Sequence, residues 1–153
     1  MKQRLAIISG VRTPFCKAPG HMKGLKADDF GAYAVKELMH RSGVNVGDLD
    51  ELIFGNVIQP TESANLARIL AVKAGIPLSI PSYTVNRNCA SGMEAITTSA
   101  NKILCDEADS ILCGGTESMS NGPVLFGEKM VNLLLKLKKA KSTGAMLSVL
   151  GGF

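Results

Sequence analysis

The chain has 153 residues, of which 46% are hydrophobic and 20% are charged, so it can form a globular domain with a core and is not disordered by composition. Four cysteines without a Cys-x-x-Cys pair, and only two histidines, suggest neither a disulfide framework nor a zinc or other metal site. No apolar run reaches membrane-spanning length and no cleavable leader follows Met1, so we expect a soluble cytoplasmic protein.

The formal net charge of +4 is unevenly distributed along the chain. Residues 126–153 contain five lysines and one acidic residue, Glu128, whereas the first 125 residues contain 12 basic and 12 acidic side chains. The basic character therefore belongs to the tail, and nothing else in the composition indicates binding to nucleic acid.

The first predicted element is a strand at residues 5–9, an aliphatic run that ends at Gly10 and is followed by a proline that cannot continue a central strand. An acidic first turn and apolar residues at helical spacing then predict an amphipathic helix over residues 28–42. His40 lies near the end of that helix, where a cation is mildly favourable.

Beyond the first helix, strand-like and helix-like segments alternate along the chain. The predicted elements are residues 51–55, 65–74, 80–85, 89–104 and 110–115. This alternation predicts an α/β fold with a mostly parallel sheet and right-handed crossovers. Chemistry in such folds gathers at the carboxyl ends of the strands, which is where Arg12, Asn56, Asn88-Cys89 and Thr116-Glu117 fall.

Cys89 stands where an extended segment passes into a helical pattern, and the small residues Ala90, Ser91 and Gly92 follow it. Backbone N–H groups at a helix start and the positive end of the helix dipole favour a thiolate over a thiol. The small neighbours would leave the sulfur open to a bulky acyl group. The local sequence is equally consistent with a buried, inert cysteine packed under a helix. We expect packing roles for Cys16, Cys105 and Cys113.

After Pro123 the sequence changes character. Residues 129–141 combine helix-forming residues with a lysine-rich face, and the chain then continues to Phe153 without a recognisable closing element. We favour a helix packed against further protein with its lysines in solvent, and keep as the alternative a surface for membranes or anionic ligands.

Four short motifs are more specific than the composition. They are Gly10-Val11-Arg12-Thr13-Pro14-Phe15, Gly55-Asn56-Val57, Asn86-Arg87-Asn88-Cys89-Ala90-Ser91-Gly92 and Gly114-Gly115-Thr116-Glu117-Ser118-Met119-Ser120. In this order they resemble the amino-terminal part of a thiolase, an acyl-CoA acyltransferase. The segment 139–144 is more similar to the thiolase subunits of multienzyme fatty-acid oxidation complexes than to the short-chain biosynthetic enzymes.

The resemblance implies a thiolase-like amino-terminal half over residues 1–122, with helices layered around a mostly parallel sheet that lacks its closing strand. Residues 123–153 would be the truncated beginning of the family's loop domain. Cys89 would be the catalytic nucleophile, coenzyme A thioesters the substrates, and no metal or tightly bound cofactor would be needed. Supporting or substrate-binding roles would fall to Asn56, Ser91, Gly92 and Met119. Structural roles, in completing a turn or in local pairing, suit Asn56 and Glu117 equally well.

The chain also departs from the thiolase pattern. The family's second half, with the histidine of Gly-His-Pro and the cysteine of Cys-x-Gly, has no counterpart here, and His21 and His40 lie in no matching motif. We therefore expect the chain alone to be inactive or nearly so. Two interpretations stay open: a catalytic half that needs a complementary polypeptide, and a non-catalytic interaction or assembly module.

The partners implied by the resemblance are acyl-CoA and free CoA, a further copy of the chain or a complementary carboxyl-terminal thiolase half, and subunits of a fatty-acid oxidation complex. Residues 129–141 would be the segment that meets a membrane or such a subunit. An open sheet edge and an uncovered apolar helix after Cys89 would favour association with itself or with a partner.

Overall fold

The computed structural model describes residues 4–151. The chain divides into two compact units, Met1–Pro123 and Val124–Phe153, which are described separately.

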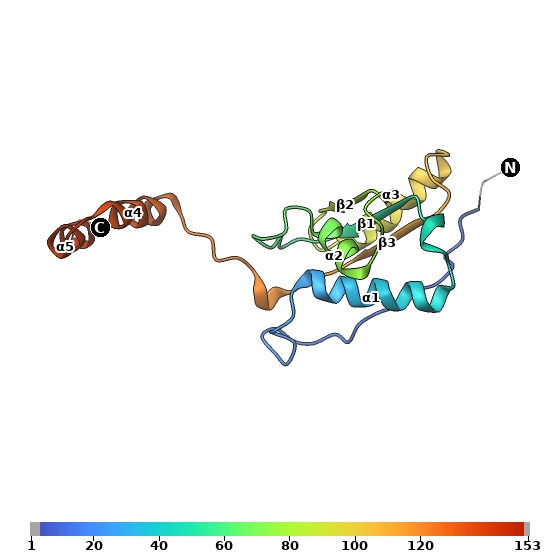
Figure 1. Cartoon of the computed structure of the whole chain (residues 1–153), viewed down its shortest axis with the longest axis horizontal. Coiled ribbons are helices and arrows are strands. Elements are labelled where there is room, and N and C mark those ends of the chain that lie inside the picture. Colours follow the sequence, from blue (N-terminus) through green and yellow to red (C-terminus); the bar gives the residue numbers. More distant parts are fainter. Residues whose placement is uncertain (1–3, 152–153) are drawn as a thin grey trace. The chain divides into compact units, whose positions relative to one another are not determined.

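The first unit is built on a parallel sheet of three strands, β1 (Glu51–Gly55), β2 (Ser82–Val85) and β3 (Ile111–Gly115), in the order β2-β1-β3 (Figure 1). The central strand β1 is apolar after Glu51 and is buried from Leu52 to Gly55, as expected for a strand covered on both faces. Because all three strands run the same way, their carboxyl ends lie at one edge of the sheet, where Gly55 is in register with Val85 and Gly115.

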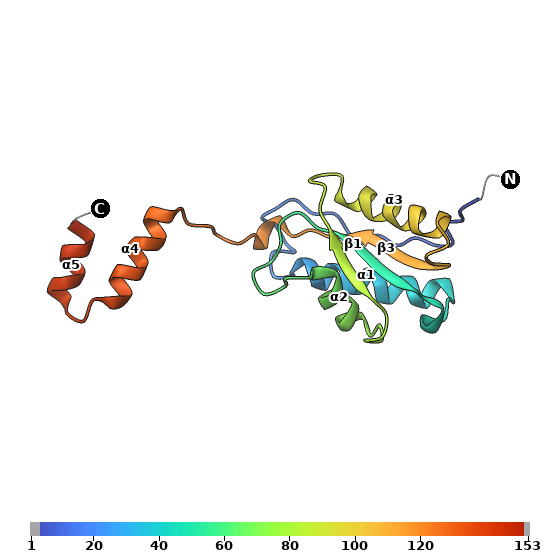
Figure 2. The ribbon, with the colours of Figure 1, turned by 90° about the horizontal axis from the view of Figure 1, so that it is seen from above.

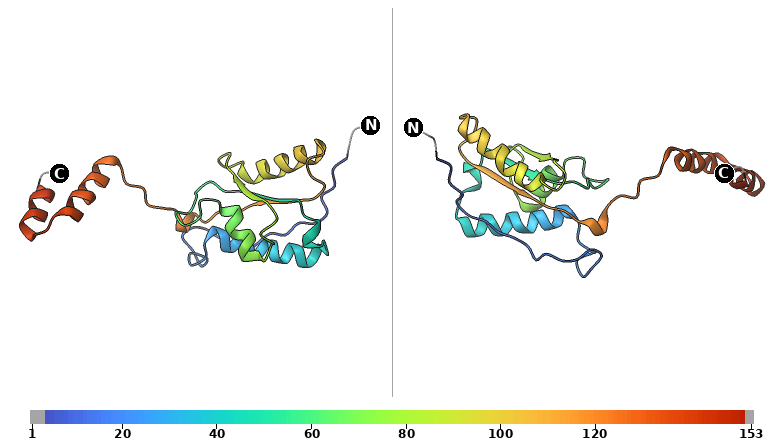
Figure 3. Two further views of the ribbon diagram at one scale, coloured as in Figure 1. Left: turned by 45° about the horizontal axis from the view of Figure 1, so that its top comes forward. Right: turned by 180° about the vertical axis from the view of Figure 1, so that it is seen from behind.

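Helices cover both faces of this sheet. The helices α1 (Ala27–Ser42) and α2 (Leu66–Ala74) lie together on one face and α3 (Ser91–Leu104) lies on the other (Figures 2 and 3). Side chains alternate along a strand, so Leu52 and Phe54 face the α1–α2 side, where they join Leu66 and Leu70 in the main hydrophobic cluster. These elements confirm the predicted α/β fold with a parallel sheet.

The predicted strand at residues 5–9 is wrong. Residues 4–16 are irregular and make no ladder with the sheet, and Ile7 and Ile8 are 89% and 72% exposed. The aliphatic run has the local preference of a strand, but a strand also needs a neighbouring backbone to accept and donate its hydrogen bonds. None of the described residues supplies that neighbour, so the segment stays extended and unpaired.

The second unit consists of the helices α4 (Glu128–Lys139) and α5 (Thr143–Gly151). The first confirms the helix expected from the lysine-rich segment, with Lys136, Lys138 and Lys139 in its last turn. The second was not predicted, because its apolar residues follow no clear helical period. Among residues 4–151, none of the helices combines the length and the apolar character that crossing a membrane requires.

Candidate functional site

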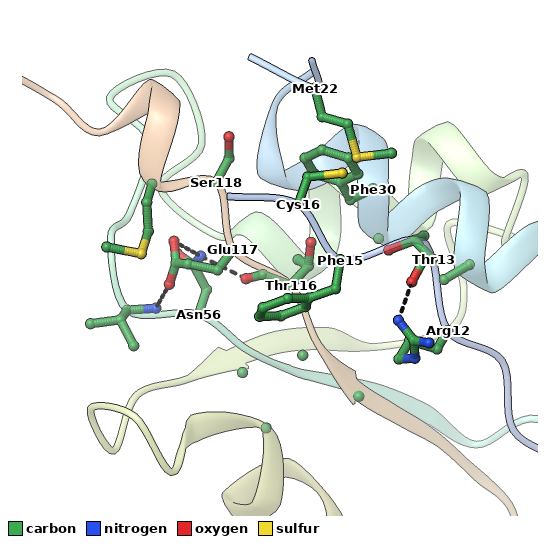
Figure 4. A pocket seen from close by; sticks show the side chains of 18 of the residues that line it. Arg12, Thr13, Phe15, Cys16, Met22, Phe30, Asn56, Thr116, Glu117 and Ser118 are labelled. Atoms are coloured by element: carbon green, nitrogen blue, oxygen red, sulfur yellow. Dashed lines mark hydrogen bonds between the residues drawn. The ribbon is translucent and has the colours of Figure 1, made fainter. Parts of the chain in front are cut away.

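A cleft of about 810 Å³ opens at the carboxyl ends of the three strands. It is lined by the loop that follows each strand and by the irregular segment 11–17 (Figure 4). The structure therefore brings the candidate residues from the sequence together around one cleft. Those that line the cleft are Arg12, Asn56, Asn88, Cys89, Ser91, Gly92, Thr116, Glu117 and Met119. His21 and His40 do not line the cleft.

Cys89 occupies a tight turn between the end of β2 at Val85 and the start of α3 at Ser91. The residue before it, Asn88, has φ of 50°, the left-handed conformation that asparagine tolerates better than most residues. The Cys89 side chain is exposed. Cys89 is therefore not buried under the helix in this chain, which agrees with the open placement expected from its small neighbours.

Ser91 holds this turn together and is itself buried. Its hydroxyl donates to the carbonyl oxygen of Asn88 at 2.6 Å and accepts from the backbone N–H of Arg87 at 2.9 Å, while its own N–H donates to Asn88 at 3.0 Å. With every polar group of its side chain occupied inside the turn, Ser91 shapes the backbone around Cys89 rather than presenting a free hydroxyl to the cleft.

Glycines allow the first turn of α3 to lie directly on the sheet. A Cβ atom on Gly55 would come within 2.3 Å of the carbonyl carbon and oxygen of Ser91, and one on Gly115 would come within 3.0 Å of the Cα of Gly92. The absence of side chains at Gly55 and Gly115 thus sets how closely the helix start approaches β1 and β3. Cys89 is held at the sheet edge by this contact.

The first turn of α3, which follows Cys89, has backbone donors that no side chain caps. Ala90 occupies the cap position and makes no side-chain cap, and the first intrahelical bond of the N-terminal turn is from Glu94 to Ala90 at 2.8 Å. The N–H groups of Gly92 and Met93 precede this bond and so have no carbonyl within the helix to which they can donate. Uncapped donors and the positive end of the helix dipole together make this a favourable place for a negative charge.

Asn56 and Glu117 form the polar floor of the cleft, with their side chains pointing toward one another (Figure 4). Asn56 Nδ2 donates to Glu117 Oε1 and to the carbonyl of Thr116, both at 3.0 Å. Glu117 Oε2 accepts from the backbone N–H groups of Val57 at 2.8 Å and Ile58 at 3.2 Å. Glu117 thus joins the loop after β1 to the loop after β3, a pairing that is distant in sequence rather than the local one considered above.

Asn56 is 3% exposed, and its buried Oδ1 has no hydrogen-bond partner among residues 4–151. An acceptor buried in this way costs about 1 to 3 kcal/mol unless a donor reaches it. Asn56 therefore has a free acceptor beside the cleft in addition to its role in the polar floor.

The rim of the cleft is apolar and open. Met119 is 73% exposed and Phe15 is 94% exposed, and both line it. The Arg12 guanidinium donates to the carbonyl of the neighbouring Thr13 at 3.0 Å, a contact within its own loop. No cluster of three His, Cys, Asp or Glu side chains suited to a metal occurs within residues 4–151.

The packing roles predicted for Cys16 and Cys105 are wrong. Both side chains are exposed, because Cys16 lies in the irregular loop at the cleft and Cys105 caps the carboxyl end of α3, whereas Cys113 on β3 is half-buried. The sequence around Cys16 and Cys105 contains apolar neighbours, but neither cysteine lies on a buried face of a regular element.

A cluster of charged groups lies at the start of α1 and is joined by ion pairs. Lys73 of α2 contacts Asp28 at 2.6 Å and Asp29 at 2.7 Å, so it ties the two helices together. The hydrogen bond from Lys73, followed by that from the Lys26 backbone, lowers the pKa of the Asp29 carboxyl. Nearby, the ion pair with Lys26 lowers the pKa of Glu62 to about 2.

Comparison with known proteins identifies the family. The chain matches the model of the thiolase N-terminal domain over residues 5–150. It is 35% identical over 146 residues to a 3-ketoacyl-CoA thiolase of Pseudoalteromonas translucida, covering 95% of this chain and 34% of that protein. It is 38% identical over 151 residues to the mitochondrial trifunctional enzyme subunit beta of Homo sapiens, covering 99% of this chain and 32% of that protein.

Among solved structures, the crystal structure of the Bacillus anthracis acetyl-CoA acetyltransferase is similar, with a TM-score of 0.77 and 34% identity over 80% of this chain and 31% of that one. The chain thus spans about a third of the length of the relatives that it matches. From the family match and these relatives, the chain belongs to the thiolase family and contains its N-terminal domain.

Proposed function

We propose that this chain supplies the nucleophile of a thiolase reaction, in which the Cys89 thiolate carries an acyl group between two coenzyme A thioesters. The observation that carries the proposal is the exposed Cys89 in the cleft, in the turn before the uncapped start of α3. The relatives named 3-ketoacyl-CoA thiolase and acetyl-CoA acetyltransferase support the same class of chemistry.

In the degradative direction, Cys89 Sγ attacks the keto carbon of a 3-ketoacyl-CoA, and a new carbon–sulfur bond forms. The bond between the second and third acyl carbons breaks, and its electron pair leaves on acetyl-CoA, which takes up a proton. Free CoA then attacks the Cys89 thioester, releases the shortened acyl-CoA and restores the thiolate. Run in reverse, the same steps condense two acetyl-CoA molecules.

Two kinds of assistance are needed for these steps. A backbone N–H at the start of α3 would stabilise the oxygen that becomes negative during attack, and such donors are each worth about 3 to 4 kcal/mol. A general acid and base must also move protons, which typically contributes about a hundred- to ten-thousand-fold. Neither His21 nor His40 lines the cleft, so we propose that the acid and base come from outside this chain.

The outer face of α3 is a suitable surface for the polypeptide that brings those groups. Met93 is 62% exposed, and Ile96 and Leu104 are also exposed although they are large and apolar. Exposed apolar side chains gathered on one helix indicate an interaction surface. We propose that a complementary carboxyl-terminal thiolase half, carried by a partner or by a longer form of the protein, covers this face and completes the cleft. By analogy with the trifunctional enzyme subunit, the assembly would belong to a fatty-acid oxidation complex.

The proposal is tested by thiolysis of acetoacetyl-CoA. The 153-residue chain alone should show no turnover, whereas mixing it with the missing carboxyl-terminal part of the Pseudoalteromonas translucida relative should restore activity. Replacing Cys89 by serine in the mixture should abolish it. Activity that survives the Cys89→Ser substitution, or turnover by the unmixed chain, would contradict the proposal. A well-formed complex without any activity would favour the non-catalytic assembly module.

A further inference from the structure

A continuous row of hydrogen bonds connects Glu117 to the turn that carries Cys89. Glu117 Oε2 accepts from the N–H of Ile58 at 3.2 Å, and the carbonyl of the same peptide group, on Val57, accepts from Asn86 Nδ2 at 3.3 Å. The other end of the Asn86 carboxamide, Oδ1, accepts from the N–H of Asn88 at 3.0 Å. The row thus runs from a carboxylate after β3, through the loop after β1, to the residue before Cys89.

Each link in this row strengthens the next. The Val57–Ile58 peptide and the Asn86 carboxamide both accept at oxygen and donate at nitrogen, so the bonds are aligned in one direction and end on a carboxylate. Aligned amides polarise one another, and a bond to an ionised acceptor is stronger than one between neutral groups. A second bond, from the Val57 N–H at 2.8 Å, anchors the same carboxylate to the loop.

The turn is a segment for which such an anchor matters. Residues 86–90 are all exposed, so the core does not fix their positions. Asn88 also has φ of 50°, a left-handed conformation that contacts on both sides of the residue support. Ser91 holds the turn from the helix side, through the Asn88 carbonyl, and Asn86 holds it from the strand side, through the Asn88 N–H.

We propose that Glu117 is a positioning residue for Cys89, acting through the Val57–Ile58 peptide and Asn86. This inference rests on the proposed function, in which Cys89 is the nucleophile. Loss of the Glu117 carboxylate would free the loop after β1, weaken the hold of Asn86 on Asn88, and let the thiol leave its place at the start of α3. Glu117 itself contacts neither Cys89 nor a reacting atom in this account.

The test is the rate at which iodoacetamide alkylates each cysteine in the full chain, resolved by peptide mass spectrometry. Cys105 is exposed at the other end of α3 and serves as the internal reference, since it reports any general loosening of the helix. The variants are Glu117→Ala, Glu117→Gln, Asn86→Ala and the double alanine variant. Glu37→Ala, on α1 outside the cleft, is the matched control for loss of a carboxylate.

In the unmodified chain the rate at Cys89 should exceed that at Cys105. Glu117→Ala and Asn86→Ala should each lower the ratio of the two rates by about three- to tenfold, the range that the net loss of one or two hydrogen bonds represents. Glu117→Gln, which keeps an acceptor oxygen, should retain most of the ratio, and Glu37→Ala should leave it unchanged. Because both residues act through one row of bonds, the double variant should lower the ratio no further than either single variant.

Two outcomes overturn different statements. If Cys89 reacts much faster than Cys105 in the unmodified chain, and Glu117→Ala leaves that ratio unchanged, the positioning role of Glu117 is refuted while the proposed function stands. Additive losses in the double variant would refute the shared row of bonds in the same way. If Cys89 in the unmodified chain reacts no faster than Cys105, the proposed function fails, and the positioning role fails with it.

Discussion

Gly55, the last residue of β1, is the position at which a single methyl group should do most damage to the site. A Cβ atom there would lie 2.3 Å from the carbonyl carbon and oxygen of Ser91 and 2.6 Å from the N of Gly92. All three are backbone atoms in the first turn of α3, so no side chain can rotate away. Since ordinary contacts are about 3.5 Å, the helix start would have to retreat by roughly 1 Å.

The expected cost follows from what this retreat disrupts. Forcing an extra methyl group into a well-packed region typically costs about 1 to 3 kcal/mol, and contact with backbone on two adjacent residues places Gly55→Ala at the top of that range. Two further substitutions calibrate the effect. Gly115→Ala, with its nearest neighbour the Cα of Gly92 at 3.0 Å, should cost less, and Gly47→Ala, with nothing within 4 Å, should cost little or nothing.

Urea unfolding of the three variants, followed by circular dichroism, measures the change in the free energy of unfolding. We expect the order of destabilisation to be Gly55→Ala, then Gly115→Ala, then Gly47→Ala. Surface substitutions usually change the free energy of unfolding by less than about 0.5 kcal/mol. If Gly55→Ala and Gly47→Ala differ by less than that, the close approach of α3 to β1, on which the position of Cys89 depends, is refuted.

Three further predictions concern stability and accessibility. The hydrogen bond from Lys73 lowers the pKa of Asp29 from 3.8, so the stability that Asp29 contributes is present above pH 3.8 and is lost as the pH falls through the lowered pKa of the folded state. Asp29→Asn should therefore reduce the fall of the urea midpoint in acid, and an unchanged fall would contradict this. Leu70 is 0% exposed in the core. Leu70→Ala should lower the free energy of unfolding by about 2 to 5 kcal/mol in the same assay, and a loss below about 1 kcal/mol would contradict this. Brief chymotrypsin digestion should cut first in the exposed, irregular stretches, after Phe15 and within 124–127. First cuts inside α1 or α2 would contradict this.

The strands and crossover helices were predicted correctly where a segment has the right local preference and a neighbouring strand or helix to pack against. The strand predicted at 51–55 coincides with β1. Its apolar residues are buried, and its backbone pairs with β2 on one side and β3 on the other. The helix after Cys89 was expected at 89–104 and begins at Ser91, since the intervening residues form the turn. The segment 5–9 has the same kind of sequence as β1 but lacks a partner strand, which no local pattern reveals.

The residues of the site could be predicted from the sequence, but the hydrogen bonds between them could not. The strand–turn–helix pattern was enough to place Cys89, Asn56 and Glu117 at one edge, because parallel strands end together. Glu117 and Val57 are far apart in sequence, however, and the short contact between them follows only from the register of β1 with β3. In the same way, the exposure of Cys105 depends on where α3 ends rather than on its neighbours in sequence.

The acyl group on Cys89 is the intermediate on which the whole account depends, and it can be measured directly. The chain, mixed with its complementary thiolase half, is incubated with acetyl-CoA, quenched in acid and digested for mass spectrometry. We predict an acetyl thioester on the peptide that contains Cys89, absent from the Cys89→Ser variant and removed when excess CoA is added before the quench. Two results would contradict the account. One is acetylation spread evenly over Cys16, Cys89 and Cys105, and the other is the lack of any acetyl group that excess CoA can remove.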